Sequence, residues 1–154
     1  PMVNPDGYAR KSRVNARQVD LNRNFPTRNF KPQEKGTRYF SGPQALSEPE
    51  SKFVHQMLQP LLETHKNKLK IVSIHAPFGL INYDGPAVAL AALMSRHNGM
   101  KTTADIGYPT PGSFGTFYGK ERSIPVITLE TPPVSGEQAW KQSRKALLAV
   151  ITGS

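Results

Sequence analysis

The stretch KIVSIH at residues 70–75 decides the fold, because it is a short apolar run that ends in a polar residue, His75. The segment PVITLE at residues 125–130 repeats this pattern and ends in Glu130. Short runs rich in β-branched residues predict buried strands. Strands that alternate with helices predict an α/β fold with a largely parallel sheet. Functional groups gather at the carboxyl ends of such strands, where His75 and Glu130 both lie.

Three helices are expected around these strands. Each begins at a capping pattern or turn and continues with apolar residues at helical spacing. They run from the box SEPE at 47–50 to about residue 64, from the turn DGP at 84–86 to about residue 97, and from SGEQ at 135–138 to about residue 152. Residues 1–4 are expected to end a strand at the turn NPDG, and 8–42 and 107–119 are expected to be loops.

Composition limits the chemistry. The 154 residues fit one domain, and no apolar run approaches the length of a membrane span. The chain has no cysteine, so only His, Asp and Glu could bind zinc. The formal net charge of +9 suits an anionic peptide at least as well as nucleic acid, for which no motif is present. We therefore expect neither a nucleic-acid partner nor a membrane partner.

Two motifs in the basic loop carry the strongest functional signal. They are NPDG at residues 4–7 and VDLNRNFP at 19–26, with Arg13 between them. Together with His75, Tyr108 and Glu130, these strings closely resemble the zinc carboxypeptidase family. The resemblance implies a mixed, largely parallel sheet flanked by helices, of the phosphorylase/hydrolase-like type.

The resemblance also implies roles for individual residues in peptide hydrolysis. His75 would be a zinc ligand, and Glu130 would be the general base that takes a proton from the attacking water. Arg13 would stabilise the oxyanion that forms on the scissile carbonyl. Asp20 would orient a zinc-ligating histidine that this chain does not contain.

Substrate binding would fall to three further residues of the same resemblance. Asn22 and Arg23 would hold the terminal carboxylate of the peptide, and Tyr108 would close over it. The remaining histidines, His55, His65 and His97, lie on expected helices without metal-ligand spacing, and we interpret them as structural.

Within the family, the strings at 42–50 and 108–115 are similar to murein peptide amidases, which cut the γ-D-glutamyl–meso-diaminopimelate bond. The implied partner is therefore a murein tripeptide. Asp84, Asp105 and Arg122 are candidates to meet the second centre of diaminopimelate, and the sequence does not choose among them. The alternatives are a general metallocarboxypeptidase acting on ordinary peptides, and an inactive carboxylate-binding module.

The family pattern is incomplete in this sequence. Family members carry a His-x-x-Glu pair before the NPDG turn, and it supplies two further ligands of the single zinc ion. The sequence is therefore expected to be a catalytic-domain fragment over residues 1–154, incomplete at its N-terminus, rather than a genuine short binding protein. The resemblance slightly favours the cytoplasm over the periplasm, and it leaves the oligomeric state open.

Overall fold

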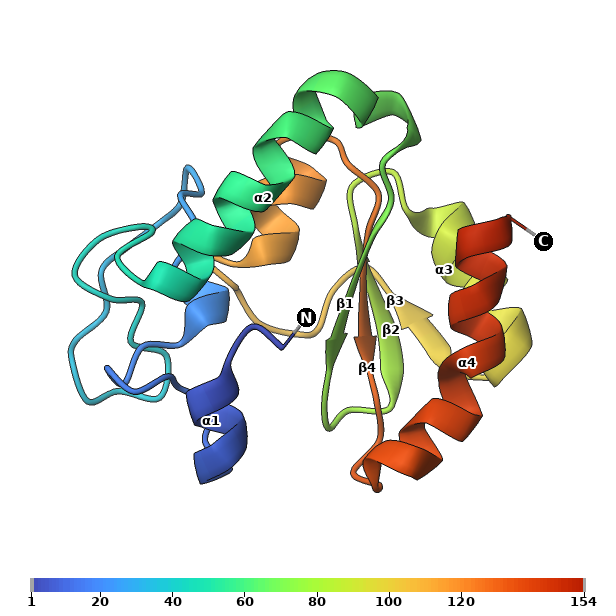
Figure 1. The fold of residues 1–154 in the computed structure, drawn as a ribbon, viewed down its shortest axis with the longest axis horizontal. Helices are drawn as coiled ribbons and strands as arrows, with labels where there is room; N and C mark the ends of the chain where they lie inside the picture. The colour runs from blue at the N-terminus through green and yellow to red at the C-terminus, as the bar shows by residue number, and fades with distance from the viewer. Residues whose placement is uncertain (1, 154) are drawn as a thin grey trace. The chain divides into compact units, whose positions relative to one another are not determined.

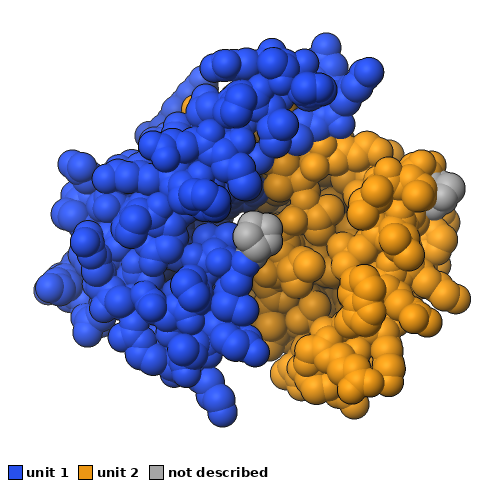
Figure 2. All heavy atoms as spheres, in the orientation of Figure 1, with its two compact units in different colours: residues 1–69, 109–117 blue, residues 70–108, 118–154 orange. Residues whose placement is uncertain are grey.

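The structure, a computed structural model, describes residues 2–153 and divides into two compact units (Figure 2). Unit 1 comprises Pro1–Leu69 and Pro109–Phe117. Unit 2 comprises Lys70–Tyr108 and Tyr118–Ser154. Each unit has its own internal packing.

Unit 1 consists of long ordered loops and helical segments, four of which lie wholly within it (Figure 1). These are α1 at Pro5–Arg10, the short 3-10 helices η1 at Leu21–Arg23 and η2 at Lys66–Lys68, and the long helix α2 at Pro49–His65. Helix α2 confirms the prediction from its apolar spacing, and it buries Val54 and Leu58. The expected loop at 8–42 is confirmed apart from the end of α1 and the single turn of η1.

The N-terminal strand was predicted wrongly. Residues 2–4 are not in a strand, and Pro1 lies outside the described residues. The side chain of Asn4 accepts a hydrogen bond from the backbone N–H of Gly7 at 2.9 Å, and Pro5 occupies the first turn. This is the chemistry of a helix start, because an Asn cap satisfies a free N–H and Pro has none to satisfy. The NPDG string therefore begins α1.

The start of α2 also differs from its prediction. The expected capping box of Ser47 and Glu50 does not form, because Glu48 is the N-cap residue and makes no side-chain capping bond. Ser47 Oγ instead donates to Glu48 Oε1 at 2.8 Å, and Asn15 Nδ2 donates to Glu48 Oε2 at 2.8 Å. The Glu48 carboxylate is thus buried but hydrogen-bonded, which is the condition for keeping a polar group in an interior.

Unit 2 is built on a four-stranded sheet. The strands are β1 at Ile71–His75, β2 at Leu80–Asp84, β3 at Lys101–Thr103 and β4 at Val126–Glu130, in the spatial order β1-β4-β2-β3. The pairs β1/β4 and β2/β3 are parallel, and β2/β4 is antiparallel. The mixed sheet confirms the predicted fold class, and β1 and β4 confirm the strands predicted at 70–75 and 125–130.

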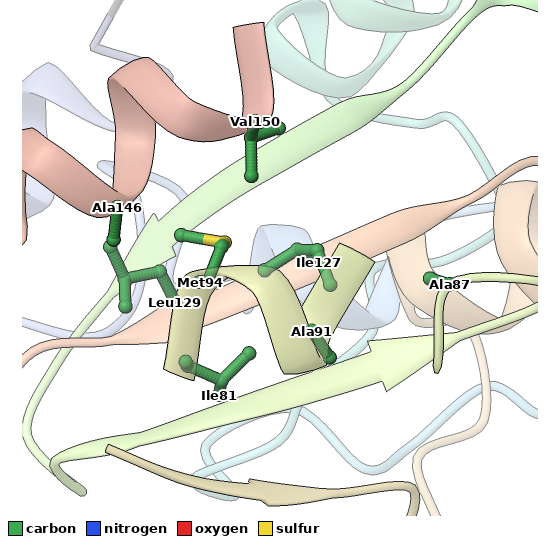
Figure 3. Packing of buried hydrophobic residues seen from close by; sticks show 8 residues of the cluster. All are labelled: Ile81, Ala87, Ala91, Met94, Ile127, Leu129, Ala146 and Val150. Carbon is green, nitrogen blue, oxygen red and sulfur yellow. The ribbon is translucent and has the colours of Figure 1, made fainter. Parts of the chain in front are cut away.

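Two helices pack against this sheet, α3 at Val88–Asn98 and α4 at Gly136–Thr152 (Figure 1). Both confirm the predicted helices, and the predicted cap of α4 is present as a capping box of Ser135 and Gln138. Figure 3 shows the buried cluster in which the two helices meet β2 and β4. Its members are Ile81, Ala87, Ala91, Met94, Ile127, Leu129, Ala146 and Val150.

The core determines which sheet residues are available for chemistry. Side chains alternate between the two faces of a strand, so Ile127 and Leu129 of β4 reach the helices while Glu130 points to the opposite face. His75 lies beside Glu130 in the parallel register and shares that opposite face.

The turn-rich segment 107–119 was expected to be loop. The structure places a π-helix, η3, at Gly115–Lys120, so this expectation is wrong for its second half.

Within residues 2–153, no helix has both the length and the apolar character needed to cross a bilayer.

Candidate active site

His75 and Glu130 form the polar end of the sheet in unit 2. They are register partners at the carboxyl ends of β1 and β4. His75 Nδ1 lies 4.0 Å from Glu130 Oε1, and the side chains are 31% and 10% exposed. A buried carboxylate beside a partly exposed imidazole is an arrangement that can hold or transfer a proton next to a ligand. The sequence placed both residues at strand ends, and the structure brings them together.

The neighbours of His75 fix its position. The backbone carbonyl of His75 accepts hydrogen bonds from Thr131 N at 2.8 Å and Thr131 Oγ1 at 3.0 Å. The ring nitrogen Nε2 lies 2.9 Å from Ser73 Oγ. Ser73 is two residues earlier on β1, so it lies on the same face of the strand. These contacts hold the imidazole at the end of the sheet.

The donor set for a metal is incomplete. Among residues 2–153, no group of three or more His, Asp or Glu side chains is arranged to hold a metal ion. A zinc site needs at least three protein ligands, and His75 would supply one. The other histidines lie on helices, with His55 and His65 in α2 and His97 in α3. The residues present therefore do not form a zinc site by themselves.

Unit 1 carries an ion pair at the start of η1. Arg13 Nε donates to Asp20 Oδ2 at 2.7 Å, and the second oxygen of Asp20 accepts the backbone N–H of Asn22 at 3.1 Å. Asp20 is the N-cap residue of η1 and its side chain is 3% exposed, whereas Arg13 is 37% exposed. Asp20 was predicted to orient a zinc-ligating histidine that this chain does not contain, and that role stays a prediction. Within the chain, its carboxylate holds Arg13 and starts η1.

The two residues expected to bind the terminal carboxylate, Asn22 and Arg23, lie in η1 just after Asp20. Arg23 is 4% exposed and its Nη1 donates to the carbonyl of Asn22 at 2.7 Å. Asn22 Oδ1 accepts the backbone N–H of Phe114 at 2.8 Å. The ring of Phe25 packs edge-on against Phe114, with centroids 5.3 Å apart. The loop after residue 109 is therefore fixed to η1.

Gly112 is part of the same contact and was not recognised from the sequence as a structural requirement. Its N–H donates to Thr27 Oγ1 at 2.9 Å, and its carbonyl accepts Phe25 N at 2.9 Å. Its φ is +70°, and a Cβ added there would lie 2.1 Å from the carbonyl oxygen of Arg23. Only glycine can bring the chain this close to the backbone of Arg23.

The other residues singled out from the sequence lie in unit 2. Tyr108 is half-buried in the turn after β3. Asp84 is buried and pairs with Lys120 at 3.3 Å, and Asp105 accepts the N–H of Gly107 at 2.7 Å. Arg122 lies over the ring of Tyr118, with its Cζ 5.9 Å from the centroid.

The mixed α/β sheet, the strand-end pair of His75 and Glu130 and the arginine-rich loop define a protein with the zinc carboxypeptidase fold. A family model described as zinc carboxypeptidase matches residues 1–86, which is more than half of the chain. The chain therefore belongs to the zinc carboxypeptidase family, whose members are zinc-dependent hydrolases of peptides.

Curated relatives make the comparison more specific. Murein peptide amidase A of Vibrio campbellii is 35% identical over 163 residues, which cover 97% of this chain and 62% of the relative. The Escherichia coli K12 protein of the same name is 33% identical over 159 residues, with 96% and 62% covered. The chain thus spans less than two thirds of the length of these relatives.

Solved structures agree with this assignment. The crystal structure of the murein-tripeptide amidase from Escherichia coli O157 superposes with a TM-score of 0.77 at 30% identity, covering 97% of this chain and 64% of that one. Carboxypeptidase A from Helicoverpa armigera superposes with a TM-score of 0.78 at 19% identity, covering 99% of this chain and 49% of that one. The second likeness shows a shared fold.

Proposed function

We propose that this protein is a murein peptide amidase that hydrolyses the bond between γ-D-glutamate and meso-diaminopimelate in a murein tripeptide. Similarity to relatives named murein peptide amidase A supports the substrate class. One structural observation supports the reaction type, which is hydrolysis. His75 and Glu130 are register partners at the end of the sheet, with their side chains 4.0 Å apart.

Glu130 is proposed as the general base. Its carboxylate is largely buried at the end of β4, and the backbone of the sheet holds it in place. It would accept a proton from the water that attacks the scissile carbonyl and then give that proton to the leaving amine. Proton transfer of this kind contributes about 10²–10⁴-fold to a rate.

The proposed roles of unit 1 concern the charges of the substrate. Arg13 is aimed by its bond to Asp20 and would stabilise the oxyanion. Asn22 and Arg23 would bind the terminal carboxylate of the peptide. Arginine suits this task because its planar group can donate two parallel hydrogen bonds. Tyr108 is proposed to close over the bound peptide.

Zinc dependence belongs to the family, and His75 is proposed as one ligand. Residues 2–153 do not complete a zinc site. The roles proposed above are therefore roles of side chains, and none of them relies on a bound zinc ion. Localisation in the cytoplasm is proposed from the resemblance alone.

The proposal is tested on the natural protein with two peptides, the murein tripeptide and an ordinary α-linked tripeptide with a C-terminal lysine. We expect release of diaminopimelate from the first to exceed release of lysine from the second. Glu130→Gln should lower kcat by about 10²-fold or more. The control Glu137→Gln removes a carboxylate that is exposed on α4 and should change nothing.

Equal or faster release of lysine would indicate a general metallocarboxypeptidase instead. A third candidate, from another class, is a carboxylate-binding module without catalysis. That candidate predicts peptide binding that is lost in Arg23→Ala, no turnover of either peptide, and no effect of Glu130→Gln.

A further inference from the structure

Three guanidinium groups of unit 1 surround one tyrosine ring. The Cζ atoms of Arg13, Arg23 and Arg38 lie 5.2 Å, 5.3 Å and 5.6 Å from the centroid of Tyr39. Each distance is within the range of a cation–π contact. The functional roles proposed above use Arg13 and Arg23 but leave Arg38 and Tyr39 unassigned.

The backbone holds this cluster together. The N–H of Asp20 donates to the carbonyl of Phe40 at 2.8 Å, and Phe40 is 8% exposed. Asn24 Nδ2 donates to the carbonyl of Ser41 at 2.7 Å. The segment that carries Arg38 and Tyr39 is therefore tied on its C-terminal side to the segment that carries Asp20 and Arg23. The position of Tyr39 beside the arginines follows from this pairing.

The cluster brings three positively charged side chains to one ring. Asp20 is the carboxylate that pairs with Arg13. For Arg38, the part of the chain that the structure describes offers no carboxylate partner, and the side chain is exposed. The three guanidinium groups share one aromatic ring. Like charges repel one another, and the ring offsets only part of that repulsion. Such a cluster is stabilised when an anion binds to it.

We propose that Arg38 is a specificity-determining residue that binds a second carboxylate of the peptide, in addition to the terminal carboxylate held by Asn22 and Arg23. This inference rests on the proposed function, because it assumes a peptide substrate with more than one carboxylate. Tyr39 positions the guanidinium of Arg38 by stacking against it. The planar fork of arginine then matches the carboxylate in a bidentate pair.

A murein tripeptide offers this second carboxylate from two sources. One is the carboxylate at the far end of the diaminopimelate side chain. The other is the α-carboxylate of the γ-linked D-glutamate. The chemistry is the same, so two modified peptides distinguish them. Lysine in place of diaminopimelate removes the first carboxylate, and isoglutamine in place of glutamate neutralises the second.

The experiment measures the dissociation constants of these three peptides by calorimetry, on the natural protein carrying Glu130→Gln to prevent turnover. Arg38→Ala should weaken binding of the unmodified tripeptide by about tenfold. The effect should disappear for whichever modified peptide lacks the carboxylate that Arg38 binds. Arg38→Lys should keep the charge and recover only part of the affinity. Lys31→Ala, which removes an exposed charge from the same loop, should leave all three constants unchanged.

An equal loss for all three peptides, or none for any, would overturn the role of Arg38. A parallel assay of the wild-type protein with the unmodified tripeptide separates this result from the proposed function. Failure to hydrolyse the tripeptide would refute the function, whereas the binding data would still test Arg38.

Discussion

The side-chain oxygen of Asn22 accepts a hydrogen bond from the backbone N–H of Phe114 at 2.8 Å, across 92 residues of sequence. An amide side chain has one acceptor end and one donor end. Since Phe114 engages the acceptor end, the amino group Nδ2 is the end that remains for a ligand, and it has no partner among residues 2–153. A free donor beside Arg23 suits a substrate carboxylate.

Asn22→Asp tests this orientation. The variant keeps an oxygen for Phe114 N but replaces the donor by a carboxylate oxygen, which repels an anionic ligand. We expect the affinity for carboxylate-terminated peptides to fall by about tenfold or more, with the melting temperature nearly unchanged. Calorimetric titration and thermal unfolding measure the two quantities. A large loss of stability with unchanged affinity would contradict the assignment.

Gly112→Ala should disturb Arg23 through the backbone. The new Cβ would lie 2.1 Å from the carbonyl oxygen of Arg23, and the φ of +70° disfavours any other residue. We expect a stability loss of about 1–3 kcal/mol together with weaker peptide binding. Gly107→Ala is the matched control, because its φ is +90° and no atom lies within 4 Å of the added carbon. It should show strain alone, with peptide affinity retained.

The sequence predicted the parts of the fold whose signal is local. Strands 70–75 and 125–130 are continuous apolar runs, and α4 has a complete capping box, so short-range patterns sufficed for them. Strand β3 has only three residues, and β2 contains the polar residues Asn82 and Asp84, so neither gives such a pattern. Strand β2 pairs with β4, which is distant in sequence, and β3 in turn pairs with β2.

The candidate active site could likewise be predicted only where its sequence signal is local. His75 and Glu130 could be placed at strand ends, but only the parallel register shows that they are neighbours. Arg38 lies in a basic loop without periodicity, where no pattern separates it from Lys31 or Lys35. Its position near Arg13 and Arg23 depends on the hydrogen bond between Asp20 and Phe40, which links distant parts of the loop.

Asp20→Asn should uncouple Arg13 from η1. One side-chain oxygen could still accept the N–H of Asn22, but the new amino group would face the donor Nε of Arg13. We expect the free energy of unfolding to fall by about 1–3 kcal/mol, because a buried charged partner is lost. Urea titration measures this change. Asp6→Asn breaks an exposed pair with Arg10 at 4.0 Å and should change stability by less than about 0.5 kcal/mol.

Lys120→Met should make unit 2 more sensitive to pH. Burial raises the pKa of Asp84 above its ordinary value, and the charge and hydrogen bond of Lys120 lower it again. A raised pKa means that the folded state holds the proton more tightly, so this contribution to stability is present in acid and lost as pH rises through the folded pKa. Without Lys120 the pKa of Asp84 rises further and more stability is lost by neutral pH.

Urea titrations at about pH 4 and about pH 7 measure that difference. Asp84→Asn removes the ionisable group and should flatten the difference relative to the wild type. If Lys120→Met and the wild type lose the same stability between the two pH values, the ion pair does not control Asp84.

Tyr118 provides the corresponding test in alkali. Burial raises the pKa of Tyr118 to about 12, and the nearby charge of Arg122 lowers it. The neutral phenol is therefore favoured by folding, and its contribution to stability is present below about pH 10 and lost as pH rises towards 12. In an ultraviolet titration, the phenol of Tyr118 should give an ionisation step at about pH 12. Tyr118→Phe should remove that step. Arg122→Gln should move the step to still higher pH, and a shift to lower pH would show that burial does not set the pKa of this phenol.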